Sequence, residues 1–308
     1  MKQALNQMPF TPINKLREVV EHRSVYTMSH CELNIMETVT ANKLISFSSN
    51  YPVISTMVKG KTVIHFSDEK PFDYIPGESI AIPSNTNIDI DFPETSEQNP
   101  TQCTVIFIDY QKISEAVAYL NEFHPRADEN GTWKSNFGHF LHFNNHRTFV
   151  EVVNDLIKII CSEQYHVKEL LVETLLKELI IRVMQMENLE QIHSNTVKYL
   201  TTNRFAYLMK YIEENLRNTL KITDLCQIVY MSKPSLFRTF KNEFGISPIE
   251  FVIRERIRLA KNLLGSQNSI KESCFKSGFN NLHYFVRTFK RVEGITPKTY
   301  VNLLTTES

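Results

Sequence analysis

The chain has 308 residues, 42% of them apolar and 22% charged, and its 34 lysines and arginines balance 34 aspartates and glutamates. A chain of this length and composition can bury more than one core, so we expect two folded domains. The residues from Phe205 to the end carry 16 lysines and arginines against 9 aspartates and glutamates, so this part is basic and the rest is acidic. A basic part attracts phosphate whatever the base sequence, whereas the acidic part disfavours a second nucleic-acid surface.

The cysteines and the first residues indicate the compartment. The five cysteines are scattered and lack CxxC spacing, which argues against a disulfide framework or a zinc site. The first ten residues lack the apolar core of a signal peptide, and no apolar run approaches the length that crosses a bilayer. We therefore expect a cytoplasmic protein with no membrane partner.

Residues 1–187 predict a mixed domain. Short β-rich runs separated by turn residues occupy about 43–109, which predicts an antiparallel sheet or, as the fold we expect, a cupin-like antiparallel β-barrel within an α+β two-domain chain. Gly60-Lys61 and Pro76-Gly77 are expected to form hairpin turns. Helical segments follow at about 147–163 and 167–187, and a polar linker is expected over 188–204.

The second helical segment carries an apolar stripe. Its members recur at helical spacing, and they are Leu170, Leu171, Thr174, Leu175, Glu178, Leu179 and Val183. This stripe either packs against the barrel or joins two copies of the chain. Both interpretations stay open at this point, and a measurement of the oligomeric state would separate them.

A cupin-like barrel raises the alternative of a metalloenzyme. Such enzymes bring several histidines to one metal, commonly with an HxH pair, but His65 stands alone and no other histidine offers that spacing. The sequence also lacks paired carboxylates with a plausible partner and any nucleophile motif. We therefore expect no catalytic residues, no metal and no cofactor. Met57, His65, Phe66 and Tyr74 are expected to point inward, but side chains of this kind are commonly core, so no ligand-binding residue is assigned.

The segment from Lys221 to Leu304 contains one unit twice, at about 222–244 and 270–293. Ile222 and Cys226 return after 48 residues. One inserted residue then shifts the offset to 49, at which Arg238, Thr239, Phe240, Lys241, Gly245, Ile246 and Pro248 return as Arg287, Thr288, Phe289, Lys290, Gly294, Ile295 and Pro297. So many matches in order indicate a duplicated structural unit.

Each copy has the residues that begin and end two short helices. The expected caps are Thr223 for the first helix, a capping box of Ser269 and Glu272 in the repeat, Ser232 and Asn280 for the second helices, and Gly245 and Gly294 at their ends. Ser247-Pro248 and Thr296-Pro297 then start a third helix in each copy. Leu236, Phe240, Phe244, Phe285, Phe289 and Val292 recur at intervals of three or four and should face inward.

Two helices joined by a tight turn predict a helix-turn-helix unit, whose second helix can enter the major groove of DNA. The opposite face of the second helices then carries Lys233, Ser235, Phe237, Arg238 and Lys241 in one copy and Asn281, His283, Val286, Arg287, Lys290 and Arg291 in the other. Arginine is well shaped for bidentate contact with guanine. The alternative is that these are ordinary solvated faces, but arginines matched in both copies argue against it.

The tandem, over about the last hundred residues, resembles the DNA-binding domain of the AraC/XylS family of bacterial transcription regulators. The motifs that carry the resemblance are MSKPSLFRTFKNEFGISP, GFNNLHYFVRTFKRVEGITP and the linker helix with Arg256-Ile257 and Ala260. The resemblance implies two recognition helices in successive major-groove segments, held apart by the linker helix. It places Pro234, Phe237, Arg238, Asn281, Leu282, His283 and Arg287 at base-reading positions; Asn280 lies beside them. Phe237 and Val286 depart from the polar residues usual in the family, which puts the base preference in question.

Together these patterns predict a sequence-specific transcription regulator that binds double-stranded DNA through residues 205–308. The N-terminal domain would be a sensor for a small-molecule effector or a partner, with RNA polymerase as a partner if the protein is an activator, and with homodimers formed through the regulatory domain. The alternatives are a cupin-type enzyme with a DNA-binding tail and an architectural protein without sequence preference. Activators and repressors can share every residue discussed, so the direction of regulation is not predicted.

Overall fold

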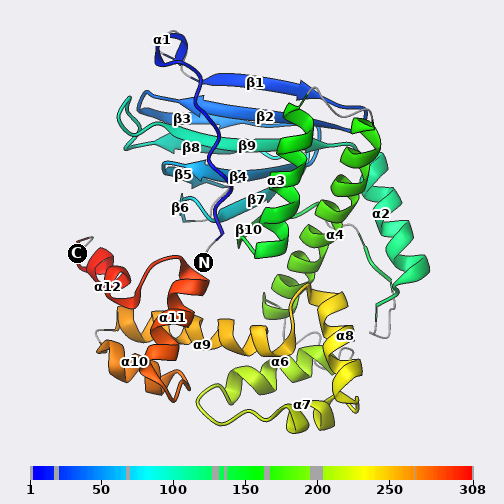
Figure 1. Cartoon of the computed structure of the whole chain (residues 1–308), viewed down its shortest axis with the longest axis vertical. Coiled ribbons are helices and arrows are strands. Elements are labelled where there is room, and N and C mark those ends of the chain that lie inside the picture. Colours follow the sequence, from blue (N-terminus) through cyan, green and yellow to red (C-terminus); the bar gives the residue numbers. More distant parts are fainter. Residues whose placement is uncertain are drawn as a thin grey trace. The chain divides into compact units, whose positions relative to one another are not determined.

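The computed structural model of the chain describes residues 3–16, 21–66, 70–126, 132–134, 137–162, 167–194, 204–266 and 268–306. The chain divides into two compact units, which are considered separately (Figure 1). One contains residues 2–120 and 134–184, and the other contains residues 121–133 and 185–308. All the strands belong to the first unit, and both helix-turn-helix repeats belong to the second.

The first unit contains two antiparallel sheets. The six-stranded sheet has the order β1 (His22–Thr27), β2 (Cys31–Thr38), β9 (Thr101–Ile108), β4 (Val53–Lys59), β7 (Glu78–Ile82) and β10 (Leu141–Asn144). The four-stranded sheet has the order β3 (Asn42–Phe47), β8 (Ile88–Phe92), β5 (Thr62–His65) and β6 (Phe72–Tyr74). The antiparallel prediction is confirmed. The closed barrel is wrong, because the pairings among the described strands leave two separate sheets.

The two expected hairpin turns connect the sheets instead. Gly60-Lys61 joins β4 of the larger sheet to β5 of the smaller one, and Pro76-Gly77 joins β6 back to β7. Gly60 has a φ of +85°, and a Cβ there would lie 2.9 Å from the Thr101 Cα. The turn therefore requires glycine, both for its backbone conformation and for space. The hairpin prediction was wrong because a turn signal does not specify which strands pair.

Three strands lie outside the predicted β region. β1 and β2 precede it, and β10 follows it. β2 pairs with β1 on one side and β9 on the other, and it buries three polar residues, Asn34, Glu37 and Thr38. Glu37 Oε1 accepts a hydrogen bond from Gln102 Nε2 at 2.9 Å. These buried polar residues interrupt the apolar alternation from which a strand is predicted.

Side chains from both sheets form one apolar core. Met57 and Tyr74, two of the residues expected to point inward, are buried in this core. Phe66 packs against it, and His65 is half-buried, with its Nε2 2.9 Å from Asp91 Oδ2. The interior predicted for a barrel is therefore the space between two facing sheets.

Four helices accompany the sheets: α1 (Ile13–Leu16), α2 (Tyr110–Phe123), α3 (Arg147–Cys161) and α4 (Lys168–Ser194). α3 packs on β10 through Phe149, whose ring centroid lies 5.2 Å from that of Phe143. α2 lies beside α4, where Lys177 Nζ is 3.2 Å from the centre of the Tyr119 ring. α4 reaches Ser194, so it extends into the range expected as a linker, and residues 195–203 lie outside the described part of the chain.

The apolar stripe of α4 differs from its predicted position. Within the first unit, the buried apolar residues of α4 are Val172, Leu176, Leu179, Ile180, Val183 and Met184. Of the residues in the predicted stripe, only Leu179 and Val183 are buried. Leu171 and Leu175 are half-buried, and Leu170 is 63% exposed. The Val172 side of the helix is therefore buried, and the Leu170 side is exposed.

The second unit is helical. Its remaining helices are α6 (Arg204–Glu214), α7 (Ile222–Ile228), α8 (Lys233–Phe244), α9 (Pro248–Gly265), α10 (Ile270–Lys276), α11 (Leu282–Glu293) and α12 (Pro297–Thr306). One core contains Phe205, Leu225, Leu236, Phe240, Phe244 and Phe251. A second core contains Ile257, Ala260, Leu264, Cys274, Phe285 and Phe289. Each repeat unit therefore has its own core, and α9 contributes its first half to one and its second half to the other.

Candidate nucleic-acid interface

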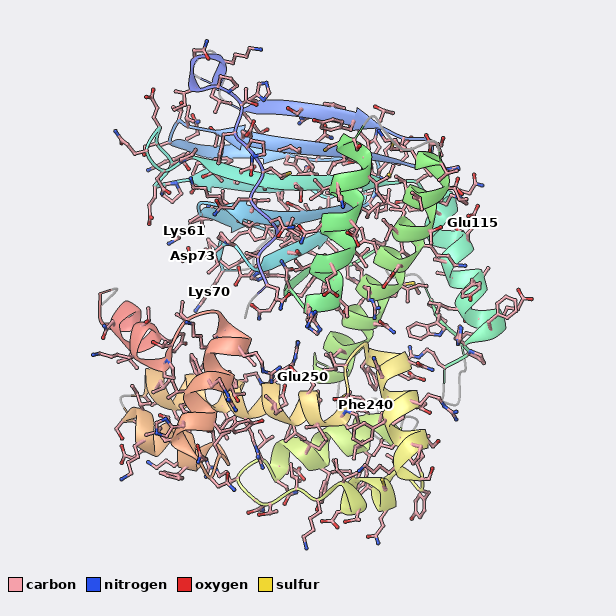
Figure 2. The ribbon with its side chains drawn as sticks, viewed as in Figure 1. Lys61, Lys70, Asp73, Glu115, Phe240 and Glu250 are labelled. Atoms are coloured by element: carbon pink, nitrogen blue, oxygen red, sulfur yellow. The ribbon has the colours of Figure 1, made fainter. Side chains whose placement is uncertain are left out.

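The first recognition helix is α8, and its ends are fixed by local capping. The Ser232 hydroxyl accepts a hydrogen bond from the Ser235 N–H at 3.4 Å, and Gly245 ends the helix with a φ of 71°. Leu236 and Phe240 are fully buried, and Phe240 points from α8 into the first core (Figure 2). These predicted caps and inward residues are confirmed.

The second recognition helix, α11, begins one residue later than expected. Its N-cap is Asn281, whose Oδ1 accepts a hydrogen bond from the Tyr284 N–H at 2.8 Å. Asn281 is equivalent to Ser232 at the offset of 49, so the inserted residue lies before the cap and not after it. Asn280 is exposed in the turn.

Of the caps predicted for the first helices of the two repeat units, α7 and α10, one is confirmed and one is wrong. The capping box of Ser269 and Glu272 on α10 is confirmed. The Thr223 cap is wrong, because α7 begins two residues earlier. Its N-cap is Lys221, which makes no side-chain hydrogen bond, and the Thr223 hydroxyl donates to Asp224 Oδ1 at 3.1 Å inside the helix. The Thr223 hydroxyl was expected to accept a hydrogen bond from a backbone N–H at the helix start. It instead donates a hydrogen bond to the neighbouring carboxylate.

The outward faces carry the predicted side chains at the surface. The exposed ones are Lys233, Pro234, Arg238, Lys241, Asn280, Asn281, Leu282, His283, Arg287, Lys290 and Arg291, while Ser235 and Phe237 are half-buried. Val286 packs against the second core. Arg238 and Arg287 therefore have the same position in their repeat units and the same exposure, as contact with a groove requires.

Arg291 has a protein partner in the first turn of α9. Its Nη1 lies 3.2 and 3.1 Å from the two carboxylate oxygens of Glu250, in the first turn of α9. Glu250 Oε1 also accepts a hydrogen bond from Arg254 Nε at 3.3 Å (Figure 2 labels Glu250). This ion pair joins α11 to the beginning of the linker helix, so Arg291 contributes to the placement of α11.

Arg256 joins both repeat units to the linker helix. Its Nε donates to the Leu216 carbonyl at 3.0 Å and its Nη2 to the Asn218 carbonyl at 2.9 Å. The guanidinium carbon also lies 6.0 Å from the centre of the Phe279 ring. Burial lowers the pKa of Arg256. The motif identified Arg256 in the sequence, but only the structure shows its role as a positioning residue.

Gly278 lies at the same junction. It has a φ of +89°, and a Cβ would lie 2.0 Å from the Leu216 carbonyl oxygen and 2.9 Å from Arg256 Nε. No side chain fits there, so the turn of the second repeat unit packs directly on the loop before the first one. Sequence reasoning missed this residue, although the turn signal after Cys274 was available.

The length of α9 sets the separation of the two recognition helices. α8 packs at its beginning, where the Phe240 and Phe251 ring centroids are 5.9 Å apart. α11 packs against its second half, through the core around Ile257 and Leu264. At about 1.5 Å per residue, an 18-residue helix is roughly 27 Å long. That length is comparable with one turn of duplex, roughly 34 Å.

Several histidines elsewhere lie close to carboxylates, and His30 lies close to two, with its ring nitrogens 3.6 Å from Asp109 Oδ2 and 3.8 Å from Glu173 Oε1. His65 lies 2.9 Å from Asp91, and His142 Nε2 lies 3.1 Å from Glu78 Oε2. Within the described residues, no three histidines, cysteines or acidic residues come together in a way that could hold a metal ion. None of the helices in the described ranges is long and apolar enough to cross a membrane.

Comparison with known families adds to this geometry. A family model described as the N-terminus of AraC-type transcriptional regulators matches residues 30–191, which is more than half of the chain. The chain belongs to the AraC/XylS family. A model for a helix-turn-helix domain matches residues 225–302, which include α8, α9 and α11.

Individual relatives match this AraC-family protein over about a third of its length. The uncharacterised regulator YfiF of Bacillus subtilis is 40% identical over 94 residues, 30% of each chain. The transcriptional activator RhrA of Rhizobium meliloti is 33% identical over 99 residues, 31% of each chain. The matches therefore span about a third of each relative. A structure of ToxT from Vibrio cholerae aligns with 90% of this chain and 100% of its own at 14% identity, with a TM-score of 0.36.

Proposed function

We propose that this AraC-family protein is a transcription regulator that selects promoter DNA by placing α8 and α11 in successive major-groove segments. One observation carries the proposal: Arg238 and Arg287 are exposed at equivalent positions of two repeat units that share one linker helix. Two such helices on one rigid linker allow a single chain to read an asymmetric site. Residues 205–308 would be the DNA-binding domain and residues 1–187 the regulatory domain.

The side chains divide into two roles by their chemistry. Arg238 and Arg287 would form bidentate contacts with guanine, and His283 and Asn280 would contact other base edges. Lys233, Lys241, Lys290 and the hydroxyl of Ser235 would contact phosphates, which position the protein without reading sequence. Pro234, Phe237 and Leu282 offer apolar contacts to thymine methyl groups. Asn281 uses its carbonyl oxygen as a helix cap, so only its amide nitrogen remains to donate to DNA.

Selection of binding sites from a random DNA pool tests the proposal. The full-length protein should select a site with two parts about one helical turn apart. Arg238→Ala should lower the preference for the selected base in one part by roughly 5- to 150-fold, which corresponds to about 1–3 kcal/mol, and Arg287→Ala should do the same in the other part. Lys241→Ala should lower the affinity for all DNA sequences alike.

The matched control is Arg147→Ala, which removes an exposed arginine from α3 that pairs with Glu151. It should leave both affinity and selectivity unchanged. Equal losses on selected and random DNA for both Arg238→Ala and Arg287→Ala would instead favour an architectural DNA-binding protein.

The regulatory part of the proposal concerns the N-terminal domain. It would hold a small-molecule effector, and its α4 would join two copies through the exposed side around Leu170. Either event would change how two DNA-binding domains align on a promoter. RNA polymerase would be a further partner where the bound site activates transcription.

A further inference from the structure

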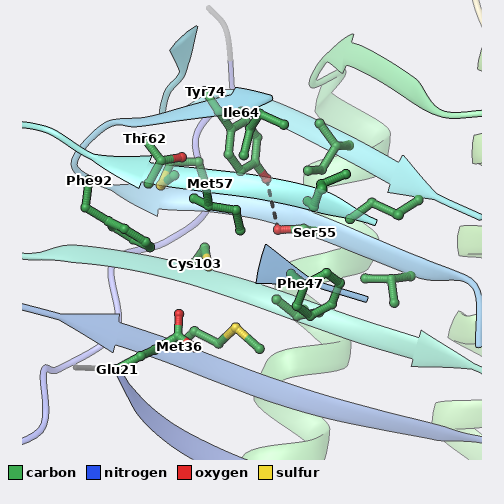
Figure 3. Close-up of a pocket in the computed structure, with 16 residues that line it drawn as sticks. Glu21, Met36, Phe47, Ser55, Met57, Thr62, Ile64, Tyr74, Phe92 and Cys103 are labelled. Carbon is green, nitrogen blue, oxygen red and sulfur yellow. Dashed lines mark hydrogen bonds between the residues drawn. The ribbon is translucent and has the colours of Figure 1, made fainter. Parts of the chain in front are cut away.

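A small cavity lies between the two sheets of the N-terminal unit (Figure 3). The cavity has a volume of about 40 Å³, and 16 residues line it. Most of them are apolar and come from both sheets, including Met36 on β2, Met57 on β4, Ile64 on β5 and Ile88 on β8. A cavity of this volume holds a few water-sized groups, so an apolar molecule enters it only where flexible lining side chains such as Met36 and Met57 move aside.

Two polar side chains in the cavity satisfy each other. Tyr74 Oη lies 3.2 Å from Ser55 Oγ, and both residues are buried (Figure 3). These groups form a polar strip whose hydrogen bonds are already made within the protein.

Thr62 is different because its hydroxyl is unpaired. Thr62 lines the cavity, is 3% exposed and lies opposite Tyr74 in the pairing of β5 with β6. Its Oγ1 is buried and has no hydrogen-bond partner among the described residues. A buried hydroxyl without a partner costs free energy, which a bound molecule would recover by pairing with it.

The charge of the lining decides which molecules fit. None of the described residues that line the cavity is lysine or arginine, and its one carboxyl group belongs to Glu21. Burial raises the pKa of Glu21 and raises that of the Cys103 thiol to about 12, so the site opposes negative charge. A carboxylate that entered would lose its hydration without gaining a cationic partner among the described residues that line the cavity.

We propose that this cavity binds a small uncharged molecule with an apolar body and one hydroxyl or carbonyl group, which pairs with the Thr62 hydroxyl. Its action as the effector of DNA binding rests on the function proposed above. This assignment excludes organic acids and polyhydroxylated sugars, because the lining offers neither a cation nor enough unpaired polar groups.

Four probes of similar size test the binding of an uncharged molecule: 1-butanol, butyrate, butylammonium and 1-chlorobutane. Methyl signals of Met36 and Met57, followed by NMR in the full-length protein, report occupancy, and Met209 in the other unit is the internal control. 1-Butanol should shift the methyl signals of both residues, and the affinity obtained from these shifts should be at least tenfold higher for 1-butanol than for butyrate or butylammonium. Equal or tighter binding of butyrate, or no shift with any probe, would overturn the proposal.

Thr62→Val tests the role of the hydroxyl. The variant should bind 1-butanol with an affinity roughly 2- to 10-fold lower, which is the usual net contribution of one hydrogen bond. Its affinity for 1-chlorobutane should stay within twofold of that of the parent. The control is Thr56→Val, because the Thr56 hydroxyl lies 2.8 Å from Ser79 Oγ and does not line the cavity. Unchanged 1-butanol affinity in Thr62→Val would remove the hydroxyl from the proposal.

DNA binding is measured in the same preparations, so the two proposals can fail separately. Selective DNA binding without any movement of the methyl signals refutes the cavity proposal alone. Methyl shifts without selective DNA binding refute the proposed function alone. A change in affinity for the selected DNA on addition of 1-butanol supports the effector role, and an unchanged affinity contradicts it.

Discussion

The turns of the two repeat units should respond to mutation in opposite ways. Tyr230 and Gly278 are equivalent, because Met231 N–H bonds the Cys226 carbonyl at 3.0 Å and Phe279 N–H bonds the Cys274 carbonyl at 3.1 Å. Both central residues have positive φ, 53° in Tyr230 and 89° in Gly278. Tyr230 is 96% exposed, whereas Gly278 has no room for a Cβ.

These surroundings set the magnitudes. Tyr230→Gly removes about 1–2 kcal/mol of left-handed backbone strain, which stabilises the folded state. The flexibility of glycine in the unfolded chain destabilises the folded state by about 0.5–1 kcal/mol. With no burial lost, the variant should be more stable by about 0.5–1 kcal/mol. Gly278→Ala places a Cβ against the Leu216 carbonyl, so it adds backbone strain and breaks the hydrogen bond from Arg256. These effects together should cost about 3–5 kcal/mol.

Amide hydrogen exchange measured peptide by peptide in the full-length protein resolves the two units. Gly278→Ala should accelerate exchange in α10 and α11 by at least a hundredfold, since each 1.4 kcal/mol is a factor of ten. Tyr230→Gly should slow exchange in α7 and α8 two- to fivefold. Gly278→Ala rates within threefold of the parent, or faster exchange in Tyr230→Gly, would refute this reasoning.

The remaining predictions concern the N-terminal unit and α4. Thr62→Val should raise the free energy of unfolding in urea by about 1 kcal/mol, because it removes an unpaired buried hydroxyl, and a loss of stability would show that the hydroxyl has a partner. Burial raises the pKa of Glu187 to about 7, so the folded chain binds more protons than the unfolded one between about pH 4.5 and 7. Stability should therefore fall with rising pH through that window, by up to about 3 kcal/mol, and Glu187→Gln should abolish this part of the dependence; equal pH profiles would contradict it. Leu170→Glu should convert a dimer to a monomer in sedimentation equilibrium, whereas an unchanged mass would exclude this side of α4 as the interface.

Local signals explain what could be predicted in the C-terminal domain. Helix caps and left-handed glycines act within one turn, so Ser232, Gly245 and the Ser269 capping box were readable from the sequence. The cap of α11 was predicted at Asn280 and lies at Asn281. The error arose because the matching residues on either side do not show where the extra residue of the second repeat unit is inserted. The contacts that join the repeat units, from Arg256 to Leu216, connect positions 40 residues apart and become visible only in the structure.

Strand pairing explains most of the error in the N-terminal domain. The runs of β residues were correct, but Gly60-Lys61 and Pro76-Gly77 lead into another sheet, and a turn signal carries no information on the pairing partner. The unpaired Thr62 hydroxyl could not be predicted either, since hydrogen-bond satisfaction depends on every neighbour in space.

The most direct test of the central claim is a guanine N7 methylation footprint on a selected DNA site, with the parent protein, Arg238→Ala and Arg287→Ala. The parent should protect guanines in two patches about one helical turn apart in the major groove. Each variant should lose one patch and keep the other. A single patch, or the same loss from both variants, would contradict two recognition helices that read successive segments of the groove.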